Sequence, residues 1–128
     1  MKTEDVDIFI KENDAWDDMI GRQKNELPSL ANMLRQAIMN RNELDEQMLE
    51  DAEMLRKALL TQDEKMHDMK ETISGQKKFL SKKLNGNWQE FGEHSLQRQR
   101  ILREQIKIIQ KKYFELKSDL MNYVWSVL

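Results

Sequence analysis

Cysteine is absent from this 128-residue chain, and glycine (four residues) and proline (one residue) are scarce. Without cysteine the chain can form no disulfide, no thiolate metal site and no cysteine nucleophile. So few turn-forming residues, together with 34% charged and 39% hydrophobic residues, indicate a small number of long helices with charged outer faces. A chain of this length is expected to form one domain.

Long hydrophobic runs are also missing. The first twelve residues are acidic and contain a short apolar patch, formed by Val6, Ile8, Phe9 and Ile10. This patch is too short for a membrane span and does not have the pattern of a signal peptide. The sequence also lacks a glycine-rich phosphate loop and a nucleophile motif. We therefore expect a soluble, cytoplasmic protein that is not an enzyme and uses no cofactor.

A heptad pattern without a miss runs through the carboxy-terminal stretch. Its positions are Leu102, Ile106, Ile109, Tyr113, Leu116, Leu120, Tyr123 and Val127. Further apolar residues beside this pattern, among them Ile101, Ile108, Phe114 and Trp125, give the helix more apolar surface than one neighbouring helix covers. The sequence therefore predicts an all-α fold, an elongated antiparallel three-helix bundle with long helices and coiled-coil-like packing. The heptad residues from Leu102 to Leu120 are expected in its core.

The helices of this single domain (residues 1–128) are expected at about 14–39, 43–84 and 87–126. Asn13 or Asp14 is placed to cap the first helix, so residues 1–12 are expected to form a loosely ordered arm. The spacings Asn40–Glu43 and Asn87–Glu90 predict capping boxes for the other two helices.

Pro28 and Gly75 fall inside two of these expected helices. Proline removes a backbone hydrogen-bond donor, and glycine in a helix interior costs about 1 kcal/mol relative to alanine. Bends are therefore expected near both residues.

A first helix that begins near residue 14 would cover only one end of the hairpin formed by the other two. Residues 70–102 are then expected to lack a third helix, which leaves half of an apolar seam exposed. We expect this half-seam to face a second copy of the chain or another helical protein. Its residues are Ile73, Leu80, Leu84, Trp88 and Phe91.

Charge is unevenly distributed along the chain. Residues 77–112 contain ten basic and three acidic residues, whereas residues 1–76 contain ten basic and eighteen acidic residues. A basic hairpin tip attracts nucleic acid, anionic lipid or an acidic protein. A solvated face, or head-to-tail pairing of subunits, explains the same charges. The candidate anion-binding residues are Lys77, Lys78, Lys82, Lys83, Arg98, Arg100 and Arg103.

Glu64 and His67 have the Glu-x-x-His spacing, which places a carboxylate and an imidazole on one face of a helix, as in di-iron carboxylate bundles. The other histidine, His94, is expected about 16 Å away along the bundle axis. The two histidines therefore cannot share a metal within one chain, and a solvated histidine is the favoured interpretation.

Two segments resemble known proteins. They are AEMLRKALLTQDEKMHDMKETI (Ala52–Ile73) and the closing YFELKSDLMNYVWSVL. They look like small bacterial helical-bundle and coiled-coil proteins of an uncharacterised family. The likeness covers about a third of the chain and rests on heptad positions. It implies a helical bundle and carries over no active residues.

These features favour a non-enzymatic helical-bundle protein that acts in protein–protein interaction or self-assembly, as a homo-oligomer or with a helical partner. The alternative is binding of nucleic acid or another anionic partner through the basic tip. A metal-binding ferritin-like bundle is the least favoured interpretation. The sequence identifies no small-molecule substrate.

Overall fold

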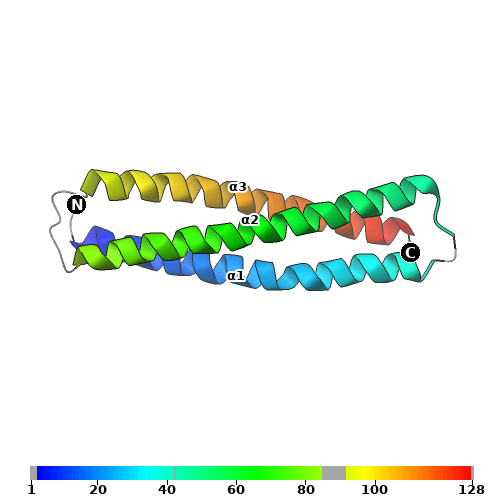
Figure 1. The fold of residues 1–128 in the computed structure, drawn as a ribbon, viewed down its shortest axis with the longest axis horizontal. Helices are drawn as coiled ribbons and strands as arrows, with labels where there is room; N and C mark the ends of the chain where they lie inside the picture. The colour runs from blue at the N-terminus through cyan, green and yellow to red at the C-terminus, as the bar shows by residue number, and fades with distance from the viewer. Residues whose placement is uncertain (1–2, 42, 85–91, 128) are drawn as a thin grey trace.

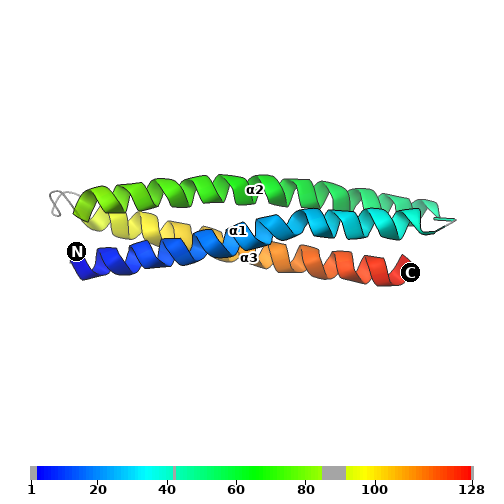
Figure 2. The same cartoon turned by 90° about the horizontal axis from the view of Figure 1, so that it is seen from below.

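Three long α-helices make up the described chain. The structure, a computed structural model, describes residues 3–41, 43–84 and 92–127. The helices are α1 (Thr3–Met39), α2 (Glu46–Leu84) and α3 (Gly92–Val127). They lie side by side, with α2 running opposite to α1 and α3 (Figure 1 and Figure 2). The predicted elongated all-α bundle is confirmed, and the described ranges contain no strand.

The core follows one heptad seam on each helix. The predicted core of α3 is confirmed, because its heptad residues from Leu102 to Leu120 are all buried. Facing it are buried apolar residues of α1 (Ile20, Leu27, Leu30, Leu34, Ala37) and of α2 (Ala52, Leu59, Met66, Met69, Ile73). Burial of each large side chain contributes about 1.5–3 kcal/mol, so the shared seam is the main source of stability.

The first helix begins at Thr3, so the prediction of a loosely ordered arm over residues 1–12 is wrong for the described part of that segment. Asn13, which was expected to cap the helix, is fully buried in the bundle instead. Continuing the seam back from Asn13 in steps of four and three leads to Phe9 and Val6, and Val6 is also fully buried. A polar residue at a core position was mistaken for a helix terminus.

The longer α1 also overturns the prediction of a hairpin end without a third helix. Ile73 and Leu80 are fully buried, so they do not form an exposed partner surface in this structure. The Leu84 side chain, Trp88 and Phe91 lie outside the described residues.

The start of α2 is set by Asp45, whose carboxylate accepts a hydrogen bond from the Met48 backbone N–H (2.8 Å). This is an N-cap interaction, and it replaces the capping box predicted at Asn40 and Glu43. The box predicted at Asn87 and Glu90 lies outside the described residues. Helix α1 continues through Pro28 and α2 through Gly75, so neither residue ends its helix.

Gly21 in α1 and Gly75 in α2 provide a matched stability test. A Cβ atom at Gly75 would meet nothing within 4 Å, so Gly75→Ala is expected to stabilise the protein by about 0.5–1 kcal/mol. A Cβ atom at Gly21 would lie 2.9 Å from Lys70 Nζ, which pairs with Asp17, so Gly21→Ala is expected to gain less. Urea unfolding monitored by circular dichroism measures both. A larger gain at Gly21 than at Gly75 would contradict the packing described here.

Candidate functional site

The surface between α1 and α2 changes character along the bundle. Between the end where α1 begins and the middle of the bundle, three ion pairs bridge the two helices, Asp14–Lys77 (2.5 Å), Asp17–Lys70 (3.2 Å) and Lys24–Asp63 (3.0 Å). Positions seven residues apart lie on one side of a heptad helix. On α1 the column of Asp17 and Lys24 therefore continues to Ala31 and Ile38, and the ionic ladder gives way to apolar residues.

An apolar groove follows from this change. It has two contiguous parts of about 260 and 410 Å³ that share Ala31, Leu34 and Arg56. The first part is lined by Pro28 of α1 and Leu60 of α2, and the second is lined by Ile38, Met39 and Leu49. Leu49 and Leu60 are 50% and 54% exposed. The groove was not predicted from the sequence, although the column of α1 residues spaced by seven is visible there.

The basic tip is partly neutralised by α1. Of the seven candidate anion-binding residues, Lys77 pairs with Asp14, and the Arg103 guanidinium pairs with Glu12 (2.7 Å). The Arg98 guanidinium lies 4.5 Å from the centroid of the Phe79 ring, a cation–π geometry. These contacts show that the acidic body of the protein meets the basic tip within one chain.

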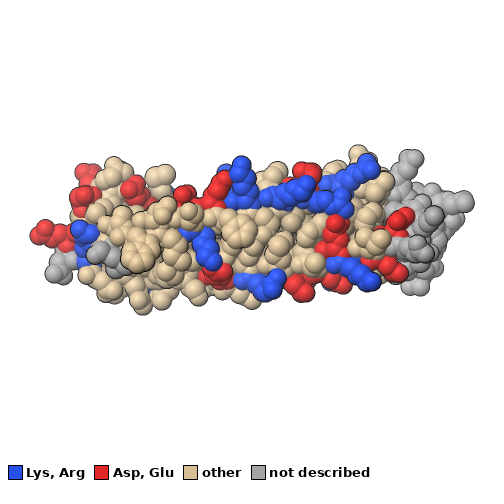
Figure 3. All heavy atoms as spheres, turned by 180° about the vertical axis from the view of Figure 1, so that it is seen from behind, with Lys and Arg blue, Asp and Glu red and all other residues tan. Residues whose placement is uncertain are grey.

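Four of the candidate residues remain exposed, namely Lys78, Lys82, Arg98 and Arg100. The Lys83 side chain lies outside the described residues. On the face opposite to that of Figure 1, lysine and arginine form a band along one edge toward the end with the α2–α3 connection (Figure 3). The structure therefore keeps part of the predicted basic surface and removes Lys77 and Arg103 from it.

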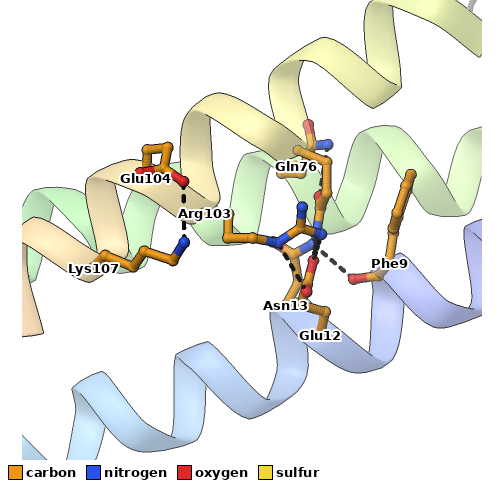
Figure 4. A network of polar contacts seen from close by, with 8 residues as sticks. Phe9, Glu12, Asn13, Gln76, Arg103, Glu104 and Lys107 are labelled. Carbon is orange, nitrogen blue, oxygen red and sulfur yellow. Dashed lines mark hydrogen bonds and ion pairs between the residues drawn. The ribbon is translucent and has the colours of Figure 1, made fainter.

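A buried polar layer crosses the bundle near this basic end (Figure 4). Each helix contributes one amide, and the Nδ2 atom of Asn13 and the Nε2 atom of Gln76 both donate to Gln99 Oε1 (2.9 and 3.1 Å). The Gln99 Nε2 atom donates to Glu12 Oε1 (2.7 Å), which also accepts from Arg103 Nη2 (2.7 Å). Within the described residues, Asn13 Oδ1 and Gln76 Oε1 are buried without a hydrogen-bond partner. From the sequence, Asn13 was expected to cap a helix, and this polar layer was not predicted.

A second polar cluster joins α1 to α3 near the middle of the bundle. The Tyr113 hydroxyl donates to Glu26 Oε2, and Lys117 Nζ lies 2.5 Å from Glu26 Oε1. The hydrogen bonds from Lys117 and Tyr113 lower the pKa of Glu26. Burial, and then the hydrogen bond to Glu26, raise the pKa of Tyr113. Through these contacts the cluster links α1 to α3.

Glu64 and His67 both lie on the exposed surface of α2. His67 Nε2 lies 3.2 Å from Glu71 Oε1, and both side chains are exposed. Among the described residues, no group of three or more His, Asp or Glu side chains is placed to hold a metal ion. The described helices also contain no stretch that is long and apolar enough to cross a membrane.

Comparison with known proteins gives no assignment. No family model, no curated protein and no solved structure matches the chain significantly. Its function must therefore be inferred from its own residues.

The Glu26 cluster predicts a pH-dependent contribution to stability. Because the folded chain lowers the pKa of Glu26 below 4.5, ionised Glu26 stabilises the fold above that value, and this contribution is lost as the pH falls through the lower folded pKa. Glu26→Gln is expected to lower the urea midpoint at about pH 7 and to have a smaller effect at about pH 3.

The control is Glu104→Gln, because Glu104 pairs with Lys107 on the outer surface of α3. Exposed pairs of this kind contribute little, so a small change is expected at either pH. An equal loss for Glu26→Gln at both pH values would show that the carboxylate charge does not matter.

Proposed function

We propose that this chain is a non-enzymatic interaction protein that self-assembles, and that a second copy covers the apolar groove between α1 and α2. The observation that carries the proposal is the replacement of the ionic ladder by an open apolar groove with exposed Leu49 and Leu60. Contiguous apolar grooves of this kind are typical of sites where helices from another subunit dock.

Charge complementarity favours a second copy as the occupant. Arg56 lines both parts of the groove and pairs with Glu53 one turn away (2.6 Å). A two-fold axis places the same patch of each subunit opposite itself, so that residue i meets residue j and j meets i. Arg56 of each subunit can then face Glu53 of the other, while Leu49 and Leu60 pack in the shared centre. The pairing would create a local four-helix layer from two α1–α2 pairs.

Dimerisation through the groove is tested by changing its leucines to lysines. Leu49→Lys combined with Leu60→Lys is expected to weaken the dimer by at least about tenfold, because two charges would be buried at the centre of the interface. Sedimentation equilibrium over a range of protein concentrations measures the change.

The matched control is Ile101→Lys combined with Ile108→Lys on the outer face of α3. These two isoleucines are 51% and 61% exposed, close to the values for Leu49 and Leu60, but they lie outside the groove. The control dimer is expected to be unchanged. A wild-type protein that stays monomeric at all concentrations, or a dimer lost only in the control variant, would refute the proposal.

A second candidate function is the binding of an anionic polymer through the basic tip. It is supported by the exposure of Lys78, Lys82, Arg98 and Arg100 after α1 has paired with Lys77 and Arg103. The described tip contains no stacking platform of exposed aromatic residues, so any contact there would be made chiefly to phosphates.

Salt dependence tests this second candidate. If the tip neutralises phosphates, affinity for a labelled DNA duplex should fall steeply with salt, with a slope of about 0.9 per phosphate on a log–log plot. Arg98→Ala combined with Arg100→Ala should reduce that slope by about 1 to 2. Lys57→Ala combined with Lys65→Ala, on the exposed surface of α2, is the control. Absence of binding at low salt would remove the candidate.

A further inference from the structure

The first sixteen described residues of α1 form an acidic cover over a basic surface. Residues 3–18 contain seven acidic residues and one lysine. Their carboxylates pair with bases of both other helices, Glu12 with Arg103 of α3 and Asp14 and Asp17 with Lys77 and Lys70 of α2. The surface beneath this segment therefore selects an acidic helix.

Few apolar contacts hold this cover in place. Among its described residues only Val6 is a fully buried apolar side chain, while Phe9 is half-buried and Trp16, also half-buried, packs against the main hydrophobic cluster. The main hydrophobic cluster reaches Ile20 on α1 but includes neither Val6 nor Leu80, which lie beyond the polar layer. Local opening is easiest where buried apolar contacts are few.

The polar layer at Asn13 lies within residues 3–18, so opening of this segment also exposes the layer. Among the residues that the structure describes, Asn13 Oδ1 and Gln76 Oε1 are buried without a hydrogen-bond partner, and each unsatisfied group costs about 1–3 kcal/mol. Opening the segment lets water reach both oxygens, which offsets part of the cost of losing Val6 from the core. From Ile20 onward, the buried apolar residues of α1 belong to the main hydrophobic cluster and stay packed.

We propose that residues 3–18 of α1 are a displaceable cover, and that the α2–α3 face beneath them binds an acidic amphipathic helix of a partner protein. The partner helix would place apolar residues over Ile73 and Leu80, and carboxylates opposite Lys77 and Arg103. The start of α1 and the connection from α1 to α2 lie at opposite ends of the bundle (Figure 1). The groove is lined by residues near that connection, among them Met39 and Leu49, so the inference does not depend on the proposed dimer.

Hydrogen exchange tests the displacement. Backbone amides of residues 5–12 are expected to exchange at least about tenfold faster than those of residues 24–37 of the same helix. Asn13→Leu combined with Gln76→Leu and Gln99→Leu replaces the polar layer with apolar residues, and it should slow exchange in residues 5–12 selectively. Equal protection along all of α1 in the wild-type protein would overturn the idea of a cover.

Binding is tested with a synthetic peptide that copies residues 3–18, a probe with the chemistry of the inferred partner. The peptide can bind only molecules whose cover is open, so its apparent affinity equals the intrinsic affinity multiplied by the fraction of open molecules. Glu12→Lys combined with Asp14→Lys makes the cover repel Arg103 and Lys77, so this variant should bind the labelled peptide at least about tenfold more tightly than the wild-type protein does. The three-leucine variant should bind it at least about tenfold more weakly.

Two controls and one replacement variant accompany this test. Glu50→Lys combined with Glu64→Lys alters net charge equally on the exposed face of α2 and should leave binding unchanged. A peptide with lysine at every acidic position should not bind. If Glu12→Lys with Asp14→Lys does not fold, Glu12→Gln with Asp14→Asn replaces it and should still bind more tightly than wild type. Lack of peptide binding by the opened variant, or equal binding of the lysine peptide, would refute the inference.

Discussion

The three helices must keep one axial alignment with each other along the whole length of the bundle. Interhelical hydrogen bonds between α1 and α3 join residues 86 to 91 apart in sequence, from Asn13–Gln99 through Gln23–Gln110 to Tyr113–Glu26. Sliding α1 by one turn would place these amides and carboxylates against apolar side chains. Buried polar groups without partners are costly, so these contacts select the register while the apolar seam supplies the stability.

Heptad periodicity made the fold predictable, and it failed where the core is polar. The seam from Leu102 onward consists of residues whose burial follows from hydrophobicity alone. Asn13 and Gln99 also occupy seam positions, but Asn13 was taken for a cap and Gln99 was not predicted to be buried, because their burial depends on partners from other helices. The predicted arm and the predicted open hairpin end were both consequences of misreading Asn13. Heptad periodicity does not predict which amide side chains pair across helices.

Surface chemistry was harder to foresee than the core. The excess of basic residues near the α2–α3 connection can be counted in the sequence. Whether a particular lysine or arginine forms an ion pair depends on which helix lies beside it. Lys77 and Arg103 face α1 and are paired, whereas Lys78 and Arg100 point elsewhere and stay exposed. The apolar groove also depends on which helices are neighbours. Ala31 and Leu49 are far apart in the sequence, and they line one groove because α1 and α2 lie side by side.

The odd number of helices places the first and last described residues at opposite ends of the bundle (Figure 1). Helix α3 alone, with 36 residues at 1.5 Å per residue, is about 54 Å long. Groups fused to the two ends would be held apart at roughly that spacing instead of being brought together. The bundle would therefore act as a rigid spacer. A pulling force applied through its ends would shear α1 along α3, so that all the helix–helix contacts would bear the force together.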